Sequence, residues 1–577
     1  MKKIFVLLTG YCLLFTAHLF AQEKKVFTHA DTLRGSITPE RAWWDVLRYD
    51  IMVKPDYPNK TIEGLVSIMF KIIGKKQTMQ IDLQQPLVID SVLTYYPFGS
   101  NYNPLKDLIN DGAVPAIVRL NFKQDGNVVL IKNEHWTEVK NHLSAITIYY
   151  HGKPREAIRP PWDGGWIWKK DSLGRPWMSV ACQGLGASVW YPCKDHQSDE
   201  PDNGASLSII VPDTLIAVGN GRLTSTQKNN DGTTTYKWEV KNPINNYNLI
   251  PYIGKYVNWS DTLQGEKGTL DLNYWVLDYD LDSAKKQFEQ VKPMLHSLEY
   301  WYGPYPFYED GYKLVESPHL GMEHQSAVAY GNNFHNGYRL GKTWVDLSGT
   351  GLGLKWDFII EHESSHEWFG NNITSKDLAD MWIHESFANY SETLYTEYLF
   401  GKEAGNEYNA GTRKRIINKE LIIAPYNVNA EGSGDMYYKG GNMLQLIRHS
   451  INDDAKWRAI LRGLNKTFYH QTVTTKQIEN YISKNAGIDF SKVFDQYLRN
   501  TQIPQLVYYY TDDKKKVFYK WDSCIAGFNL QLVLMHDDKC LRIKPTQQWQ
   551  SLDDVPFFDQ AWIEKNYYIR IKEVRKN

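Results

Sequence analysis

The stretch that decides the fold reads His362-Glu363-Ser364-Ser365-His366 and continues, after eighteen further residues, to Glu385. Residues four apart lie on one face of an α-helix, so His362 and His366 can direct two imidazoles at a single point. This spacing is typical of a zinc site in which the glutamate after the first histidine acts as a base. The alternative interpretation is a pair of surface histidines on an ordinary helix.

Two helices are predicted around this stretch. Trp356, Ile359 and Ile360 lead into the first with helical spacing, and Gly370 is placed to end it as a left-handed residue. A carboxylate at Glu385 on a buried helix face is costly unless a partner such as a metal ion compensates it. The second helix is indicated by an inward-facing stripe of Leu378, Met381, Trp382, Glu385, Ala388, Glu392 and Leu399.

Other histidines lie near this stretch. His384 precedes Glu385 but projects about 100° away from it around the helix, so we do not expect it to be a ligand. His319 and His324 lack the carboxylate–histidine spacing typical of metal sites, so no second metal is expected. The sequence predicts one zinc ion.

The chain begins with a segment typical of protein export. Lys2 and Lys3 precede the apolar residues 4–20, and the small residue Ala21 follows. This pattern predicts a cleavable signal peptide over residues 1–21. No other stretch is apolar enough to span a bilayer. We therefore expect a secreted or periplasmic protein of a bacterial cell envelope, without stable membrane insertion.

Charge and cysteine content narrow the remaining possibilities. The formal net charge is −1, or −3 once Lys2 and Lys3 are removed, so nucleic acid and anionic membranes are not expected as partners. Two interpretations stay open for the cysteines of the mature chain: disulfides between the neighbouring pairs, or four buried free thiols. These residues are Cys182, Cys193, Cys524 and Cys540.

Periodicity divides the chain into a multidomain α+β protein. From about Trp43 to Tyr256 the pattern is short alternating strands and turns, with turn signals at 56–59 and 229–232, which predicts a β-sandwich-like N-terminal domain over residues 22–260. Residues 261–500 are predicted to form a mixed α/β catalytic domain, and 501–577 a small β domain. Helices are expected at 283–302, 440–451, 455–469, 475–485 and 490–500.

With these segments in place, the chain resembles the M1 family of zinc metallopeptidases, the aminopeptidase N and leukotriene A4 hydrolase group. The resemblance covers most of the mature chain and implies a thermolysin-like catalytic domain. It rests on Trp190-Tyr191-Pro192-Cys193-Lys194-Asp195, Asn220-Gly221, Tyr302-Gly303-Pro304-Tyr305-Pro306, Met322-Glu323, the stretch from His362 to Asn371, the stretch from Trp382 to Glu392, and Tyr437-Tyr438-Lys439-Gly440.

The resemblance implies a role for each matching residue. Glu363 looks like the general base, Tyr437 like the hydroxyl that stabilises the oxyanion, and Glu323 like the carboxylate that holds the substrate's α-amine. The implied zinc ligands are His362, His366 and Glu385, and the implied substrate-binding residues are Glu323, Gln183, Gly321 and Met322.

The sequence departs from the family pattern at three positions. Leu320 replaces the glycine of the usual Gly-x-Met-Glu-Asn element, where Gly321 could partly substitute, and His324 replaces its asparagine. Gln183 stands where aminopeptidases commonly carry a glutamate that shares the amine. One anion fewer is expected to weaken amine binding and to shift substrate preference.

The leading functional prediction is an exported zinc-dependent aminopeptidase that removes N-terminal residues from peptides with a zinc-activated water. The alternatives are a zinc endopeptidase or epoxide hydrolase on the same site, and an inactive peptide-binding protein. Asp380 could orient a zinc-binding histidine, or it could be a surface carboxylate of the helix. Many relatives continue into a large helical domain, so the short segment after Leu498 implies a more open cleft unless a second subunit covers it.

Overall fold

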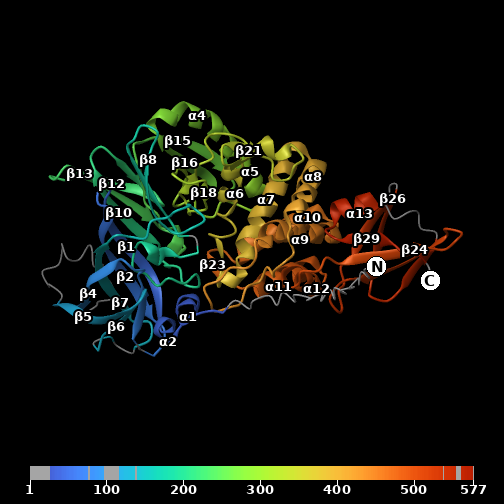
Figure 1. Ribbon diagram of the computed structural model, residues 1–577, viewed down its shortest axis with the longest axis horizontal. Coiled ribbons are helices and arrows are strands. Elements are labelled where there is room, and N and C mark those ends of the chain that lie inside the picture. Colours follow the sequence, from blue (N-terminus) through green and yellow to red (C-terminus); the bar gives the residue numbers. More distant parts are fainter. Residues whose placement is uncertain are drawn as a thin grey trace, which may run out of the picture.

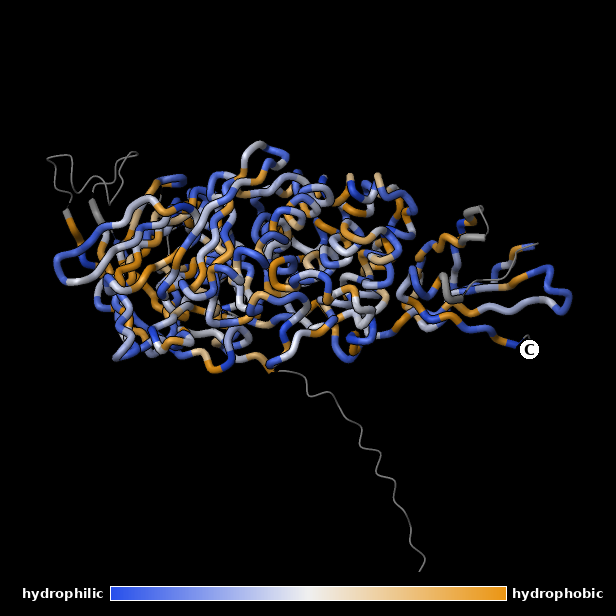
Figure 2. Tube along the Cα trace, turned by 90° about the horizontal axis from the view of Figure 1, so that it is seen from above, coloured by the Kyte–Doolittle hydropathy of each residue, from blue (hydrophilic) through white to orange (hydrophobic). Residues whose placement is uncertain are grey.

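The computed structural model describes residues 26–575 except 76–77, 97–115, 135, 137–138, 183, 537–538 and 554–559. The predicted signal peptide therefore lies outside the described residues. Three regions follow one another along the long axis: β-strands, then mainly helices, then a small β region (Figure 1). In all three regions, hydrophobic and hydrophilic residues alternate along the Cα trace (Figure 2). The predicted multidomain α+β fold is confirmed.

The N-terminal region contains a ten-stranded and a four-stranded sheet. The larger sheet has the order β12-β13-β10-β1-β2-β7-β4-β5-β6-β3 and the smaller one β11-β14-β9-β8. The predicted turn at 56–59 joins β1 to β2, and that at 229–232 joins β12 to β13. The strands are β1 (Trp44–Asp56), β2 (Thr61–Ile72), β3 (Met79–Asp82), β4 (Val88–Tyr96), β5 (Ala116–Asp125), β6 (Val128–Lys132), β7 (Leu143–Gly152), β8 (Gly165–Lys170), β9 (Pro176–Ala181), β10 (Ala205–Pro212), β11 (Ile216–Val218), β12 (Arg222–Lys228), β13 (Thr233–Val240) and β14 (Tyr252–Gly254).

The sheet that carries the site begins at Tyr256. Its order is β15-β16-β17-β19-β18, so β18 lies at an edge. One face packs under the helices, and the other joins the core of the N-terminal region. The domain boundaries at 260 and 500 remain a prediction. The strands are β15 (Tyr256–Gly265), β16 (Gly268–Leu277), β17 (Tyr312–Glu316), β18 (Gly321–Met322) and β19 (Val328–Tyr330).

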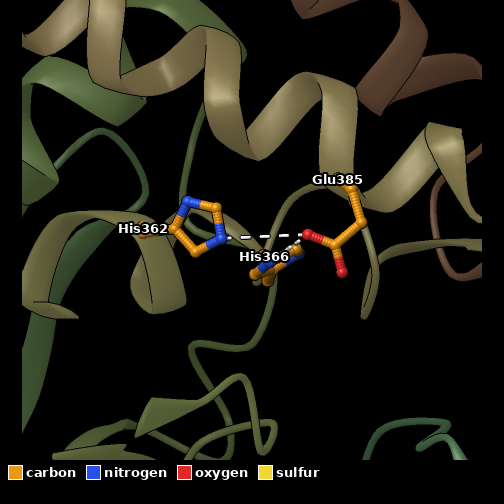
Figure 3. A group of neighbouring side chains, drawn as sticks. All are labelled: His362, His366 and Glu385. Atoms are coloured by element: carbon orange, nitrogen blue, oxygen red, sulfur yellow. Dashed lines mark ion pairs between the residues drawn. The ribbon is translucent and has the colours of Figure 1, made fainter. Parts of the chain in front are cut away.

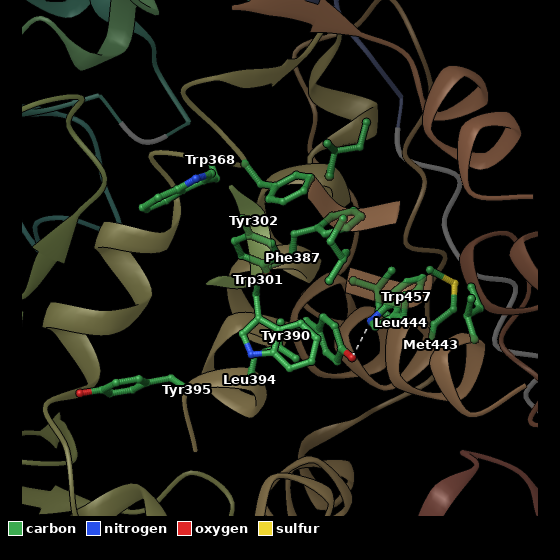
Figure 4. Packing of buried hydrophobic residues seen from close by; sticks show 14 of the residues in the cluster. Trp301, Tyr302, Trp368, Phe387, Tyr390, Leu394, Tyr395, Met443, Leu444 and Trp457 are labelled. Carbon is green, nitrogen blue, oxygen red and sulfur yellow. Dashed lines mark hydrogen bonds between the residues drawn. The ribbon is translucent and has the colours of Figure 1, made fainter. Parts of the chain in front are cut away.

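Helices fill the middle of the molecule. Aromatic and aliphatic side chains of α5, α7, α9 and α10 form its core (Figure 4), where the Trp457 indole donates to the Tyr390 hydroxyl at 3.0 Å. The helix α8 was not predicted. The helices are α4 (Leu281–Gln287), α5 (Val291–Tyr302), α6 (Phe358–Ser365), α7 (Trp382–Phe400), α8 (Lys402–Thr412), α9 (Asp435–Ile451), α10 (Asp454–Thr467), α11 (Thr475–Ala486) and α12 (Ser491–Leu498).

The remaining elements are short. Two helices precede the first strand, and a four-stranded sheet of order β28-β25-β24-β29 lies near the end of the chain. Among the described residues, three further strand pairs form two-stranded sheets: the antiparallel pairs β20-β21 and β26-β27 and the parallel pair β22-β23. These short elements are α1 (His29–Gly35), α2 (Pro39–Ala42), β20 (Tyr338–Leu340), β21 (Thr343–Val345), β22 (Ile373–Ser375), β23 (Gln471–Val473), β24 (Gln505–Tyr510), β25 (Lys516–Asp522), β26 (Leu532–His536), β27 (Lys539–Ile543), β28 (Gln550–Asp553), α13 (Gln560–Asn566) and β29 (Arg570–Glu573).

The structure decides between a disulfide and free thiols for Cys182 and Cys193. Cys182, Cys193 and Cys524 are free thiols, so the disulfide Cys182–Cys193 is not formed. The side chain of Cys540 lies outside the described residues. Every helix in the described part of the chain is too short or too polar to cross a bilayer.

Candidate metal centre and active site

The first site helix, α6, is held at its N-terminus by Asp357. This carboxylate accepts hydrogen bonds from the backbone N–H groups of Ile359 at 3.1 Å and Ile360 at 3.5 Å, which would otherwise lack partners in the first turn. It also accepts from the Tyr330 hydroxyl of β19 at 2.8 Å. The cap therefore fixes the helix to the sheet at the same time.

The predicted end of this helix was wrong. The helix ends at Ser365, with His366 as its C-cap, and not at Gly370. A further turn follows, in which Gly370 has φ +133° and donates to the Ile373 carbonyl at 2.9 Å. The glycine is still required by its backbone conformation, but it ends the turn and not the helix.

His362, His366 and Glu385 converge as predicted (Figure 3). Their ligand atoms lie within 4.8 Å of one another, with Glu385 Oε2 at 3.8 Å from His362 Nε2 and 3.6 Å from His366 Nε2. Glu385 Oε2 is buried without a hydrogen-bond partner, which is costly for a carboxylate oxygen unless a cation compensates it. Two imidazoles and one carboxylate form a donor set that zinc binds with an open fourth position. The residues therefore fit a zinc ion.

Each histidine is oriented through its other ring nitrogen. His362 Nδ1 lies 3.0 Å from Glu392 Oε1, and His366 Nδ1 lies 3.0 Å from the Phe369 carbonyl. These contacts direct both Nε2 atoms toward Glu385. Glu392 also accepts from the Tyr408 hydroxyl at 2.7 Å, so the carboxylate is itself fixed.

Neither prediction made for Asp380 holds. Asp380 is buried, so it is not a surface carboxylate, and it accepts from the Thr475 hydroxyl and the Tyr426 hydroxyl, both at 2.6 Å, instead of contacting a histidine. The residue that does orient a metal-binding histidine is Glu392, for which no such role was predicted. It lies seven residues after Glu385, which places both on the same face of α7. His384 accepts from the Ser375 backbone N–H at 2.8 Å, consistent with its exclusion as a ligand.

Burial and neighbouring charges shift the pKa values at the centre. Burial would lower the pKa of His362, but the nearby carboxylates of Glu385 and Glu392 outweigh it and raise that pKa. Burial would raise the pKa of Glu385, but His366 and His362 hold it below its usual value. Burial raises the pKa of Glu363 to about 8 although His362 opposes the shift. The raised pKa makes the deprotonated form of Glu363 a stronger base than an ordinary carboxylate.

The edge strand β18 places Glu323 beside the centre. The Tyr247 hydroxyl donates to Glu323 Oε1 at 3.0 Å, and the Asn371 amide donates to its backbone carbonyl at 2.9 Å. Gly321 lies against α6, since a Cβ added at this glycine would be 2.6 Å from Glu363 Oε1. Glycine at 321 therefore allows β18 to approach Glu363, and its predicted role in substrate binding stays a prediction.

His324, the second departure in this strand, has a packing role. Its ring is fully buried, and its Nδ1 forms a hydrogen bond with the Tyr252 hydroxyl. Burial and then the neighbouring His319 lower the pKa of His324 well below the usual value, so its ring is neutral. The described residues contain one group of side chains suited to a metal ion, and neither of these histidines belongs to it.

Tyr437 approaches the centre from α9. Its ring lies 6.2 Å from that of His362, centroid to centroid. Burial, and then Glu385 and Glu431, raise its pKa well above the usual value, so its hydroxyl stays protonated. The close contact of α9 with α7 is possible because Gly440 faces Ser386, where an added Cβ would lie 1.8 Å from Oγ.

A cavity opens beside Glu323. Its wall includes Met322, Tyr247, Cys182, Gly184, Arg34 and Glu431. Gln183, predicted to bind substrate, lies outside the described residues, but both its neighbours line the cavity. Sequence reasoning missed Arg34 and Glu431, because both stand in segments that have neither a motif nor a clear periodicity.

Two family models match the chain. The Peptidase M1 N-terminal domain matches residues 46–247, and the Peptidase family M1 domain matches residues 308–497. The chain belongs to peptidase family M1. The second match contains the whole metal centre, together with Glu323 and Tyr437.

Similar proteins agree with this assignment. Aminopeptidase N of Lactobacillus helveticus is 26% identical over 56% of the chain and 38% of that relative. Leukotriene A-4 hydrolase of Xenopus laevis is 22% identical over 55% of the chain and 51% of that relative. Probable aminopeptidase 1 of Sulfurisphaera tokodaii is 20% identical over 92% of the chain and 62% of that relative. The chain thus spans less than two-thirds of these curated relatives.

Solved structures share the fold. A two-domain M1 zinc metallopeptidase variant bound to L-tryptophan superposes with a TM-score of 0.61 at 18% identity, over 77% of the chain and 91% of that structure. A variant of the M1 zinc metallopeptidase from Deinococcus radiodurans bound to a Tyr-Ser-Ala substrate gives 0.61 at 18% identity, over 79% of the chain and 94% of that structure. At this identity the likeness concerns the fold alone.

Proposed function

We propose that this M1-family chain is a zinc-dependent aminopeptidase that removes N-terminal residues from peptides. The observation that carries the proposal is the position of Glu323: its carboxylate lines a cavity, and its charge acts on Glu363, which lies in α6 between the two metal-binding histidines in sequence. A negative group at that position can hold a free α-ammonium, and the first peptide bond then falls at the metal centre. The solved relatives crystallised with an amino acid and a short peptide support the same substrate class.

The side chains divide the chemistry among them. His362, His366 and Glu385 would hold zinc, which supplies Lewis acidity that polarises the scissile carbonyl and makes water more acidic. Glu363 takes a proton from the attacking water and returns it to the leaving nitrogen. Tyr437 donates a hydrogen bond to the carbonyl oxygen as negative charge develops there. Glu323 binds the α-ammonium and fixes which bond is cut.

The test compares free and blocked substrates. The enzyme is purified, loaded with zinc, and given aminoacyl p-nitroanilides with a free or an N-acetylated amine. We expect hydrolysis of the free-amine series alone, loss of activity with a chelator, and recovery when zinc is restored. Equal cleavage of the acetylated series would contradict amine anchoring, and cuts inside a blocked peptide would indicate an endopeptidase.

We also propose that the protein is exported with cleavage after Ala21, because Lys2, Lys3 and the apolar residues 4–20 have the composition of a signal peptide. N-terminal sequencing of the protein from the cells that produce it checks this proposal. A mature chain that begins at Gln22 is expected. A chain that still begins at Met1 would contradict it.

A further inference from the structure

Glu431 lies in the substrate cavity together with Glu323. Both carboxylates line its wall, and Glu431 stands six residues before Tyr437, outside every motif that carries the family resemblance. Burial, and then the charges of Glu385 and Glu323, raise the pKa of Glu431 to about 7. Glu431 is therefore within electrostatic reach of a metal-binding carboxylate and of the amine anchor.

The segment that carries Glu431 is fixed on both sides. Asn429 donates through its side chain to the Gly184 carbonyl at 3.3 Å and through its backbone N–H to the Asp31 carbonyl at 3.1 Å. On the other side, Gly432 lies so close to Ile422 that an added Cβ would be 1.6 Å from its carbonyl oxygen. Contacts on both sides therefore position the segment that carries Glu431.

The same contacts bring Glu431 to the stretch where the family pattern is broken. Gly184 directly follows Gln183, the position at which aminopeptidases commonly carry the second amine-binding glutamate. The hydrogen bond from Asn429 to Gly184 joins two segments that are 245 residues apart in the sequence. The family pattern predicts a second carboxylate directly before Gly184, and Glu431 reaches the cavity that Gly184 lines from a different segment.

We propose that Glu431 supplies the second negative charge that receives the substrate's α-ammonium, in place of the carboxylate that Gln183 lacks. The proposal rests on the peptidase function proposed above. An ammonium group offers three N–H donors, and Glu323 already accepts one hydrogen bond from Tyr247. Two carboxylates that line one cavity repel each other, and a cation bound between them relieves that repulsion.

The cavity is less suited to the other use of Glu431, which is to bind a basic first side chain. Arg34 also lines the cavity, where its guanidinium donates to Asp195 at 2.9 Å and to Asn429 at 3.1 Å. A lysine or arginine side chain that entered the cavity would approach this cation. The charges that act most on Glu431 are those of Glu385 and Glu323, which frame the reacting end of the substrate.

The kinetic test uses Glu431→Gln, which removes the charge and keeps the shape. We expect KM for leucine p-nitroanilide to rise about tenfold or more, since a hydrogen bond to a charged group contributes about 1.5–3 kcal/mol, while kcat changes less than about threefold. Asp377→Asn is the matched control, because Asp377 lines the same cavity but accepts the backbone N–H groups of Ala379 and Asn427. Its KM is expected to stay near the wild-type value.

Two further measurements separate amine binding from a general effect. Adding Gln183→Glu to Glu431→Gln is expected to bring KM back toward the wild-type value, because the family pattern has an amine-binding glutamate at this position. Calorimetry on the zinc-loaded proteins compares L-leucine with 4-methylpentanoic acid, which lacks the amine. The substitution at 431 should weaken binding of L-leucine and leave that of the amine-free acid unchanged.

The outcomes distinguish this proposal from the one on which it rests. An active wild type whose Glu431→Gln variant keeps its KM and its affinity for L-leucine would overturn the role of Glu431. A rise in KM confined to lysyl and arginyl substrates would also overturn it, in favour of side-chain binding. If the wild type hydrolyses no free-amine substrate, the peptidase proposal fails, and the calorimetric comparison still decides whether Glu431 binds an amine.

Discussion

At the scale of single residues, the position of His362 depends on Glu392. The carboxylate contacts Nδ1 at 3.0 Å and leaves Nε2 free for the metal. For Glu392→Gln we expect the zinc dissociation constant to rise about tenfold or more, as is usual for residues that orient a metal-binding histidine. Competition with a chromophoric chelator measures it. Asp380→Asn, which alters a carboxylate that contacts Thr475 and no histidine, should keep wild-type zinc affinity. Equal affinities for both variants would contradict the orienting role.

Tyr437 is expected to act on the reaction rate and not on metal binding. Its hydroxyl, whose pKa is raised, stays protonated and can donate to the developing oxyanion. For Tyr437→Phe we expect kcat to fall about 10²- to 10³-fold, the effect of removing one oxyanion donor, with zinc affinity unchanged. Tyr438→Phe removes the neighbouring hydroxyl as a control and should keep kcat. Similar losses in both variants would indicate a packing defect in place of a catalytic role.

At the scale of elements, the contact between α7 and α9 determines how Tyr437 faces the metal centre. Gly440 and Gly441 let the helices approach, and Ser386 Oγ donates to the Met436 carbonyl at 2.6 Å. For Gly440→Ala we expect a loss of about 1–3 kcal/mol in the free energy of unfolding, because the added methyl overpacks the contact. kcat should fall as well, since α9 carries Tyr437.

A thermal unfolding curve and a kcat measurement check this prediction. Gly434→Ala is the matched control, since Gly434 is the N-cap of the same helix and an added Cβ there meets no atom within 4 Å. The backbone of Gly434 is already helical (φ −59°, ψ −8°), so alanine fits there without strain, and the exchange should change the free energy of unfolding by less than about 1 kcal/mol. If Gly440→Ala unfolds like Gly434→Ala and keeps its kcat, the glycine is not needed for this contact.

The same elements show what the sequence could predict. The metal ligands were predictable because His362 and His366 are four apart and Glu385 lies on a periodic stripe, so local spacing places all three. The α8 helix was missed because Gly405 and Gly411 interrupt a polar segment with little apolar periodicity. The role of Glu431 could not be inferred, because it depends on contacts with residues that are far away in the sequence.

At the scale of the whole molecule, the sheet β15-β16-β17-β19-β18 contributes side chains both to the core under the helices and to the core of the N-terminal region. In β17 and β19, Leu314 and Val328 pack under the helices, while Val315 and Ala329 pack into the N-terminal core. Met322, next to the amine anchor, belongs to the N-terminal core as well. The residues that hold substrate therefore depend on the N-terminal region, although the metal ligands lie outside it.

Because this sheet packs into both cores, we expect that a fragment beginning at Tyr256 cannot fold by itself, even though it contains every metal ligand. Without the N-terminal region, Val315 and Met322 would face water, at a cost of about 1.5–3 kcal/mol for each side chain, and β18 would lose its support. We expect one cooperative thermal transition for the full chain, raised by zinc because zinc binds only the folded state. The fragment should show neither a cooperative transition nor a zinc-dependent midpoint, whether followed by circular dichroism or by calorimetry. A fragment that melts cooperatively near the full-chain temperature, and is stabilised by zinc to the same extent, would show that the helical core folds independently of the shared sheet face.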